Sequence, residues 1–256
     1  MAAPLSRSLP WLLVATLVAV GVCSLRLAPR QASRSSTGES ETVVLLHGLG
    51  RTNLSMWRLA SALREQGYSV LNLDYPSRRR SIDQLAEFLA SQIDRCCRES
   101  PRIHFVTHSL GGIVLRYFLD GHQVDSLGRV VMLSPPSGGS ELVDHLREYS
   151  VFREVLGPTA EWLGTDSESL PSQLGPVDFE LGVITGESSL NPLFSWLIPG
   201  PDDGTVSVES AQTPGMSDFL VVPYGHTFIM SRQAVIDQTI HFLEHGRFVH
   251  PAANGT

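Results

Sequence analysis

The chain has 256 residues, of which 42% are apolar, so it is long enough to bury a sizeable core in a single α/β domain. Its formal net charge is −7 and all 19 basic residues are arginine. This charge excludes nucleic acid as a default partner, because binding to phosphates needs a basic face.

The N-terminal segment from Leu9 to Leu25 is apolar and nearly uncharged, and Arg26, Arg30 and Arg34 follow it. Its length of roughly 17 residues is the lower limit for a membrane-spanning helix. We predict that residues 1–29 form an uncleaved single-pass membrane anchor. A cleaved signal for export to the periplasm is the alternative. Residues 30–41, rich in Ser, Arg and Gly, are a linker.

From residue 42 onward, apolar strand-like segments alternate with helix-like ones. The predicted strands are Thr42–Leu46, Val70–Leu73, Ile103–Thr107, Arg129–Leu133, Phe179–Thr185 and Phe219–Val222. The predicted helices are Asn53–Gln66, Ser81–Arg98, Ile113–Leu119, Glu141–Leu156 and Ser231–His245, and 164–176 reads as a polar loop. This alternation predicts an α/β fold with a mostly parallel central sheet and helices on both faces. We expect one domain over 42–248, with a short cap near 141–176 and a tail at 249–256.

Ser109 stands at a predicted turn between a strand and a helix, in Thr107-His108-Ser109-Leu110-Gly111. A nucleophile elbow has this order, because a strained turn lifts the serine hydroxyl above the sheet and small neighbours leave room for it. The usual pattern is Gly-x-Ser-x-Gly, and here Thr107 replaces the first glycine. Ser109 is the candidate nucleophile, and an ordinary βα turn is the alternative.

The loop His47-Gly48-Leu49-Gly50 follows the first predicted strand directly. In a hydrolase sheet, one oxyanion donor comes from this loop and the other from the residue after the nucleophile. The candidate donors are therefore the backbone N–H groups of Leu49 and Leu110. His47 and Gly48 are candidate substrate-binding residues. The alternative is a glycine-rich βα turn, whereas a dinucleotide fingerprint fails for lack of a third glycine at the required spacing.

Two later loops contain a candidate base and a candidate acid for Ser109. His226 lies between the last predicted strand and the last helix, where it can reach back to the serine, whereas His108 should point away from Ser109. Asp203, in Asp202-Asp203-Gly204, is the candidate acid because it immediately precedes the glycine, and Asp202 is the alternative. The chain order Ser109, Asp203, His226 is that of the hydrolase fold. A simple turn would also explain the two aspartates.

Three further patterns carry weaker signals. Pro136 lies in a proline- and glycine-rich stretch after a strand and is a candidate for the acyl pocket, or part of a turn. His241, Glu244 and His245 match an inverted zinc-protease pattern, but no third ligand is identifiable, so we predict no metal. Cys96 and Cys97 are adjacent, and we expect packing residues or free thiols because a bridge between neighbours would be strained. No cofactor is implied.

With these motifs in order, residues 42–246 resemble the lipase/esterase branch of the α/β-hydrolase superfamily, particularly compact bacterial triacylglycerol-lipase-like proteins. The resemblance implies hydrolysis of a small-molecule or lipid carboxylic ester through an acyl-enzyme. Acyl transfer, or cleavage of a thioester or amide, would use the same triad. A non-catalytic binding protein with the hydrolase fold is the alternative of another class. The acyl length, the head group and the oligomeric state are left open.

Overall fold

The structure is a computed structural model, and it describes residues 40–147, 157–189 and 192–251. Its centre is a six-stranded sheet in the order β2-β1-β3-β4-β5-β6, and every neighbouring pair is parallel. The strands are β1 Thr42–Leu46, β2 Ser69–Leu73, β3 Ile103–His108, β4 Leu127–Leu133, β5 Leu181–Gly186 and β6 Asp218–Val222. The predicted parallel α/β architecture is confirmed.

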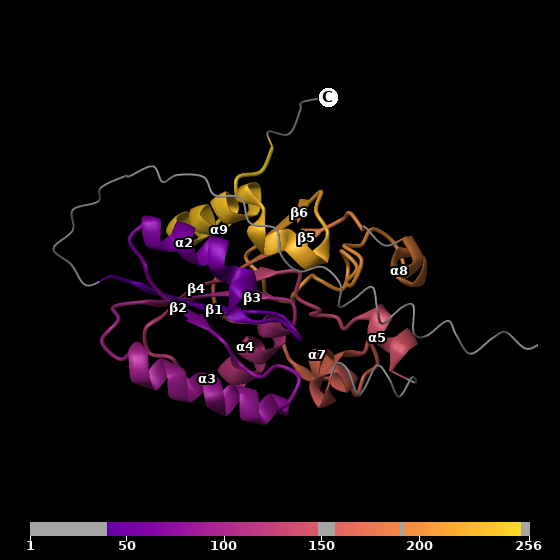
Figure 1. Cartoon of the computed structure of the whole chain (residues 1–256), viewed down its shortest axis with the longest axis horizontal. Helices are drawn as coiled ribbons and strands as arrows, with labels where there is room; N and C mark the ends of the chain where they lie inside the picture. Colours follow the sequence, from indigo (N-terminus) through magenta and orange to yellow (C-terminus); the bar gives the residue numbers. More distant parts are fainter. Residues whose placement is uncertain (1–39, 148–156, 190–191, 252–256) are drawn as a thin grey trace, which may run out of the picture.

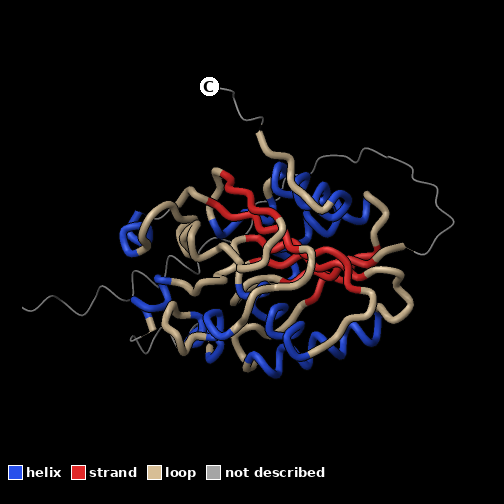
Figure 2. The backbone as a smooth tube through the Cα atoms, turned by 180° about the vertical axis from the view of Figure 1, so that it is seen from behind, coloured by secondary structure: helices blue, strands red, loops and turns tan. Residues whose placement is uncertain are grey.

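Helices cover both faces of this sheet (Figure 1). One face carries α2 (Trp57–Glu65) and α9 (Gln233–His245), and the opposite face carries α3 (Ile82–Cys96) and α4 (Leu110–Gly121). Seen from behind, the strands form a twisted layer between the two helical layers (Figure 2). Three short helices, α5 (Glu141–Leu146), α7 (Leu170–Gln173) and α8 (Pro192–Leu197), group beyond one end of the strands (Figure 1).

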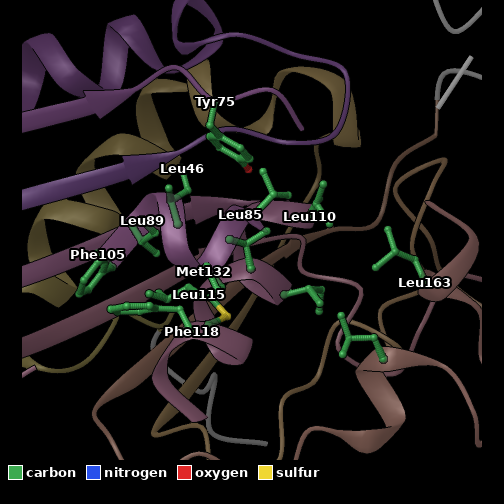
Figure 3. Close-up of a cluster of buried hydrophobic side chains, with 14 of the residues drawn as sticks. Leu46, Tyr75, Leu85, Leu89, Phe105, Leu110, Leu115, Phe118, Met132 and Leu163 are labelled. Atoms are coloured by element: carbon green, nitrogen blue, oxygen red, sulfur yellow. The ribbon is translucent and has the colours of Figure 1, made fainter. Parts of the chain in front are cut away.

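Two apolar cores fill the spaces between the layers, and the strand period assigns residues to them. Successive strand side chains point to opposite faces. In β1, Val44 and Leu46 therefore enter the core beneath α3 and α4, while Val43 and Leu45 enter the core beneath α2 and α9. Figure 3 shows part of the first core. Because both faces are covered, the strands are apolar at most positions on both faces, which is the pattern of a parallel sheet.

Parallel pairing brings the carboxyl ends of all six strands to one edge of the sheet, called here the carboxyl edge. In open parallel sheets, ligands bind beyond these ends. Each strand is followed there by a connection that carries polar residues, and α5, α7 and α8 lie beyond the same edge (Figure 1).

The element boundaries differ from the sequence prediction in a few places. The predicted helix at 53–66 is a 3-10 turn, η1 (Asn53–Met56), followed by α2. Helix α4 begins at Leu110 rather than Ile113, and Ser81 caps α3 by accepting from Gln84 N. The predicted loop 164–176 contains α7, while η2 (Pro158–Leu163) and α8 were not predicted. These short helices have too few turns to show a hydrophobic period.

The prediction for Cys96 and Cys97 is wrong, because the structure joins them in a disulfide. The helix ends between them: Cys97 is the C-cap of α3, with φ −122° and ψ 5°. The backbone therefore leaves the helical path at the point where the two side chains meet.

The predicted anchor or export segment, residues 1–29, falls outside the described residues and stays a prediction, as do the domain limits and the cap. Among the helices that the structure describes, none is both long and apolar enough to cross a membrane.

Candidate active site

Ser109 occupies a strained turn between β3 and α4. Its φ is 53° and its ψ is −124°, so a residue with a side chain lies in a region that favours glycine. The turn is held by two backbone hydrogen bonds: the Ser109 N–H donates to the Leu133 carbonyl at 2.9 Å, and the Gly112 N–H donates to the Ser109 carbonyl at 2.9 Å. The structure thus has the geometry of a nucleophile elbow at the residue that the sequence singles out.

Gly111 is the residue of this turn that has no room for a side chain. A Cβ there would lie 2.7 Å from the Leu46 carbonyl oxygen and 3.0 Å from that of His47. Thr107, where the usual pattern has glycine, points into the α4 side and is fully buried. Its Oγ1 finds no hydrogen-bond partner among the described residues. The fold therefore needs the second glycine of the pattern and tolerates threonine at the first.

His226 lies between Ser109 and Asp203 in space. Its Nε2 is 3.0 Å from the Ser109 Oγ, and its Nδ1 is 2.8 Å from the Asp203 Oδ2. A carboxylate only accepts, so Nδ1 carries the proton and Nε2 is free to accept the serine O–H. The Asp203 side chain is fully buried and that of His226 is 11% exposed, so their hydrogen bond is shielded from water. The histidine comes from the start of η3 (His226–Ser231).

The two adjacent aspartates have different surroundings. Asp203 Oδ1 accepts from the backbone N–H groups of Thr205 and Val206, at 3.0 and 2.9 Å, which leaves Oδ2 for the histidine. Asp202 turns the other way and accepts from the Ser195 hydroxyl at 2.9 Å and from the Gly204 N–H at 2.7 Å. The structure therefore brings Asp203, and not Asp202, to His226.

The loop after β1 passes beside the elbow. A Cβ at Gly48 would lie 2.8 Å from the His108 Nδ1 and 3.2 Å from the Ser109 Cβ, so only glycine lets the loop come this close. Among the described residues, the backbone N–H groups of Leu49 and Leu110 make no hydrogen bond to another loop. Leu110 is also the first residue of α4, where a backbone N–H has no acceptor within the helix. Both donors are therefore available, in agreement with the oxyanion prediction.

His47 is fully buried, and its ring stacks on Tyr75 at 4.2 Å between centroids. Its Nδ1 donates to the Gly48 carbonyl at 2.9 Å, and its Nε2 accepts from the Tyr75 N–H at 3.3 Å. The Tyr75 hydroxyl in turn donates to the His47 carbonyl. Burial lowers the pKa of His47, although the Gly48 carbonyl and Asp74 oppose this shift. In the structure the His47 ring therefore packs against the loop after β1 and supports it, and the substrate-binding role of His47 stays a prediction.

Two side chains near His226 have roles that the sequence did not indicate. His108 reaches the backbone of the base, with its Nε2 3.1 Å from the His226 carbonyl oxygen and the two rings 4.8 Å apart. Arg51, just beyond the loop after β1, donates from Nη2 to the Thr227 carbonyl. No sequence pattern marks either contact, because each depends on the order of strands in the sheet.

The remaining candidates make contacts of other kinds. Pro136 is buried in the connection after β4, where its carbonyl accepts from Gly139 N at 3.0 Å, and its role in an acyl pocket stays a prediction. His241 and His245 stack on each other at 4.2 Å on α9. In the described parts of the chain, no group of three or more potential ligand residues is arranged to hold a metal ion.

The family model described as the alpha/beta hydrolase family matches residues 43–242, most of the chain. The chain belongs to the alpha/beta hydrolase family. The sheet and the helical layers on its two faces are those of this fold, and the expected resemblance is confirmed.

Several proteins with similar sequences or folds carry esterase or lipase names. A probable esterase, PIR7A of Oryza sativa subsp. indica, is 28% identical over 116 residues, which cover 41% of this chain and 44% of that protein. The match thus spans less than half the length of that relative. Bacillus licheniformis lipase BlEst2 in its mature form has a TM-score of 0.69 at 17% identity, over 84% of this chain and 96% of that one. Phospholipase PlaB from Legionella pneumophila has a TM-score of 0.61 at 19% identity, over 80% and 57%. At these identities the two structures show the shared fold.

Proposed function

We propose that this alpha/beta hydrolase is a serine hydrolase that cleaves carboxylic esters through an acyl-enzyme. The observation that carries the proposal is the continuous chain of contacts from the Ser109 Oγ through His226 to Asp203, at 3.0 and 2.8 Å. A serine hydroxyl is a weak nucleophile unless an adjacent base takes its proton. The esterase and lipase names among the similar proteins favour an ester as the substrate.

In the proposed mechanism, the Ser109 Oγ attacks the ester carbonyl while His226 Nε2 accepts its proton. The buried Asp203 carboxylate holds the imidazole in the required tautomer and stabilises the imidazolium that forms. The N–H groups of Leu49 and Leu110 donate to the oxyanion, and one such donor is worth about 3–4 kcal/mol. His226 then protonates the leaving alcohol. Water then attacks the acyl-enzyme, with His226 again accepting the proton, and the acid is released while the Ser109 hydroxyl is regenerated.

The decisive experiment is Ser109→Ala, assayed with a short-chain p-nitrophenyl ester. Loss of the nucleophile in a triad lowers kcat by on the order of 10⁶-fold, so the variant should show no hydrolysis above background. Ser91→Ala, at an exposed position of α3, is the matched control and should keep full activity. A fluorophosphonate probe should label the native chain and not Ser109→Ala. Hydrolysis by the folded Ser109→Ala variant would refute the proposal.

An ester panel of graded acyl length would then narrow the substrate. Product analysis in the presence of a competing alcohol separates hydrolysis from acyl transfer, because a transferase would form the new ester in preference to the free acid.

A further inference from the structure

The backbone around His226 is held by hydrogen bonds with residues of three other segments at the carboxyl edge. The His226 N–H donates to the Asp203 carbonyl at 2.9 Å. The His226 carbonyl accepts from His108 Nε2 at 3.1 Å, and the next carbonyl, that of Thr227, accepts from Arg51 Nη2. Thus the base is fixed through its main chain as well as through its ring.

Each of these three contacts originates beside another group of the proposed machinery. Asp203 is the proposed acid itself. His108 immediately precedes the nucleophile, and Arg51 lies two residues after the oxyanion donor Leu49. The loops that carry the acid, the nucleophile and the oxyanion donor therefore all hold the loop of the base.

We propose that His108 and Arg51 are positioning residues that hold the backbone of residues 226–227, so that the His226 ring stays within reach of Ser109. The inference rests on the proposed function, since it concerns how the base is kept in place. Neither side chain touches the reacting atoms; both act through His226.

The direction of the His108 side chain follows from the strand period. Val106 and His108 alternate with Phe105 and Thr107 along β3, and Val106 belongs to the core beneath α2 and α9. His108 therefore points to the same face of the sheet, where η3 carries His226. His108 can therefore reach His226 without lying between Ser109 and His226, although it directly precedes Ser109 in the sequence.

The environment of His108 keeps its ring neutral. Its Nε2 faces a carbonyl oxygen and so carries the proton, whereas its buried Nδ1 has no hydrogen-bond partner among the described residues. Burial lowers the pKa of His108 well below its ordinary value, and the nearby His226, Arg51 and His47 lower it further, against the carbonyl of His226, which raises it. A neutral ring donates to the backbone of the base without competing for the proton that the base takes up.

Arg51 is suited to a similar task. Burial lowers the pKa of its guanidinium, and no carboxylate of the described residues pairs with it. Its Nη2 is instead committed to the Thr227 carbonyl. A hydrogen bond from a charged donor is about twice as strong as a neutral one, so this single contact can hold the loop after β1 against the loop of the base.

The test compares His108→Leu, which removes the donor, with His108→Gln, whose amide N–H can donate to the same carbonyl. A displacement of about 1 Å costs on the order of 10²-fold in rate. We expect His108→Leu to lower kcat by about 10- to 100-fold with KM within about threefold of native. His108→Gln should recover kcat to within about fivefold.

The matched control is His104→Leu, because His104 is also fully buried on β3 but lies at the other end of the strand. It should lower the unfolding midpoint and leave kcat and KM unchanged. Arg51→Met keeps the aliphatic stem, removes the donor, and should reproduce the kcat loss of His108→Leu. In a His226→Ala background, neither change should lower the residual rate further, since both act through His226.

The inference is overturned if folded His108→Leu keeps its kcat, if His108→Gln is as slow as His108→Leu, or if either change still slows His226→Ala. If His108→Leu does not fold, the Arg51→Met variant tests the inference instead, because Arg51 is partly exposed. A native kcat in Arg51→Met overturns the inference, and a lower kcat with KM preserved supports it. Activity of Ser109→Ala would instead refute the proposed function, so the two failures are distinguishable.

Discussion

The two edges of the central sheet satisfy their polar groups differently. In the part of the chain that the structure describes, every buried side-chain polar atom without a hydrogen-bond partner lies in the last two residues of a strand, in the connection that follows, or at the first residue of α5. The atoms belong to Arg51, Asn72, Thr107, His108, Ser134, Glu141 and Thr185. Among the described residues, the two with positive φ other than glycine, Ser109 at 53° and Ser134 at 47°, lie at this edge too.

The amino edge of the sheet, by contrast, pairs its buried polar groups. His104 Nε2 bonds to Glu41 at 3.1 Å, and its Nδ1 accepts from the Arg129 N–H at 2.9 Å. The Arg129 side chain in turn bonds to Glu180 at 3.1 Å and to the Leu243 carbonyl at 2.8 Å. The difference therefore lies in the last residues of the strands and in the segments that follow them. Backbone strain and unsatisfied atoms cost stability, and this molecule confines them to the edge with the proposed site.

The largest expected effect is at the carboxyl edge, in the pair Asp203→Asn and Asp202→Asn. Asn at 203 presents no carboxylate to fix the His226 tautomer, so kcat should fall by on the order of 10⁴-fold. Asp202 holds Ser195 and the Gly204 N–H instead of the histidine, so its variant should lose stability and keep most of its kcat. Steady-state kinetics with thermal unfolding of each variant tests this. A greater kcat loss in Asp202→Asn would reverse the assignment.

A second comparison lies within α4. At Gly111 an added Cβ would meet the Leu46 carbonyl oxygen at 2.7 Å, whereas at Gly121 it would meet nothing within 4 Å. Overpacking of this kind costs about 1–3 kcal/mol, so Gly111→Ala should be destabilised and should lose activity as the loop after β1 is pushed away. Gly121→Ala should keep its activity and change stability by less than about 1 kcal/mol. Urea unfolding with parallel assays measures both; equal stability of the two variants would contradict the close approach.

The pH dependence of stability tests the amino edge. Burial lowers the pKa of His104, against Glu41, which raises it, while Arg102 lowers it and the Arg129 N–H raises it. Between the folded pKa and the unfolded value of about 6.5, the unfolded chain binds more protons, so stability is complete above about pH 6.5 and falls as the pH drops below it.

Each such histidine contributes at most about 1.4 kcal/mol per pH unit. His104→Leu should therefore flatten the fall in unfolding free energy between about pH 6.5 and 5. Urea titrations at several pH values measure the slope. An unchanged slope would show that protonation of His104 does not contribute to the pH dependence of the unfolding free energy.

The smallest effect concerns Thr107 and Thr239, which are both fully buried. The Thr107 hydroxyl has no partner in the described structure, whereas that of Thr239 donates to the Val235 carbonyl at 2.8 Å. Thr107→Val should raise the unfolding free energy by about 1 kcal/mol, and Thr239→Val should lower it by about 0.5–1 kcal/mol. A loss of stability in Thr107→Val would indicate that its hydroxyl has a partner, such as a bound water.

The sequence suffices for the strands and for the candidate nucleophile, acid and base. The strands are apolar runs between turn residues, and parallel pairing brings the loops that follow them to one edge. This rule and the chain order are enough to select Ser109 and His226 as candidates. Whether Asp203 or Asp202 faces His226 depends on how each side chain turns. The local sequence favours Asp203, which directly precedes Gly204, but does not determine the outcome.

What the sequence did not reveal depends on contacts between distant segments. Tyr75 supports the loop after β1 because β2 pairs beside β1, and the sheet order is not written in any one stretch. His108 reaches η3 because of the strand period and the position of the last loop. The packing of the His47 ring on Tyr75 was not predictable either, because the sequence does not show which side chain lies beside a glycine-rich loop.

The distance in sequence between Ser109 and His226 is 117 residues, and this separation affects when the site can form. The base lies after β6, the edge strand, and the contact between base and nucleophile closes a very long loop, which is among the slower events of folding. During synthesis, Ser109 leaves the ribosome well before its base. Under the proposed mechanism, the serine is an ordinary alcohol until β6 has docked. An incomplete chain should then have no hydrolase activity, and activity would report that the whole sheet is assembled.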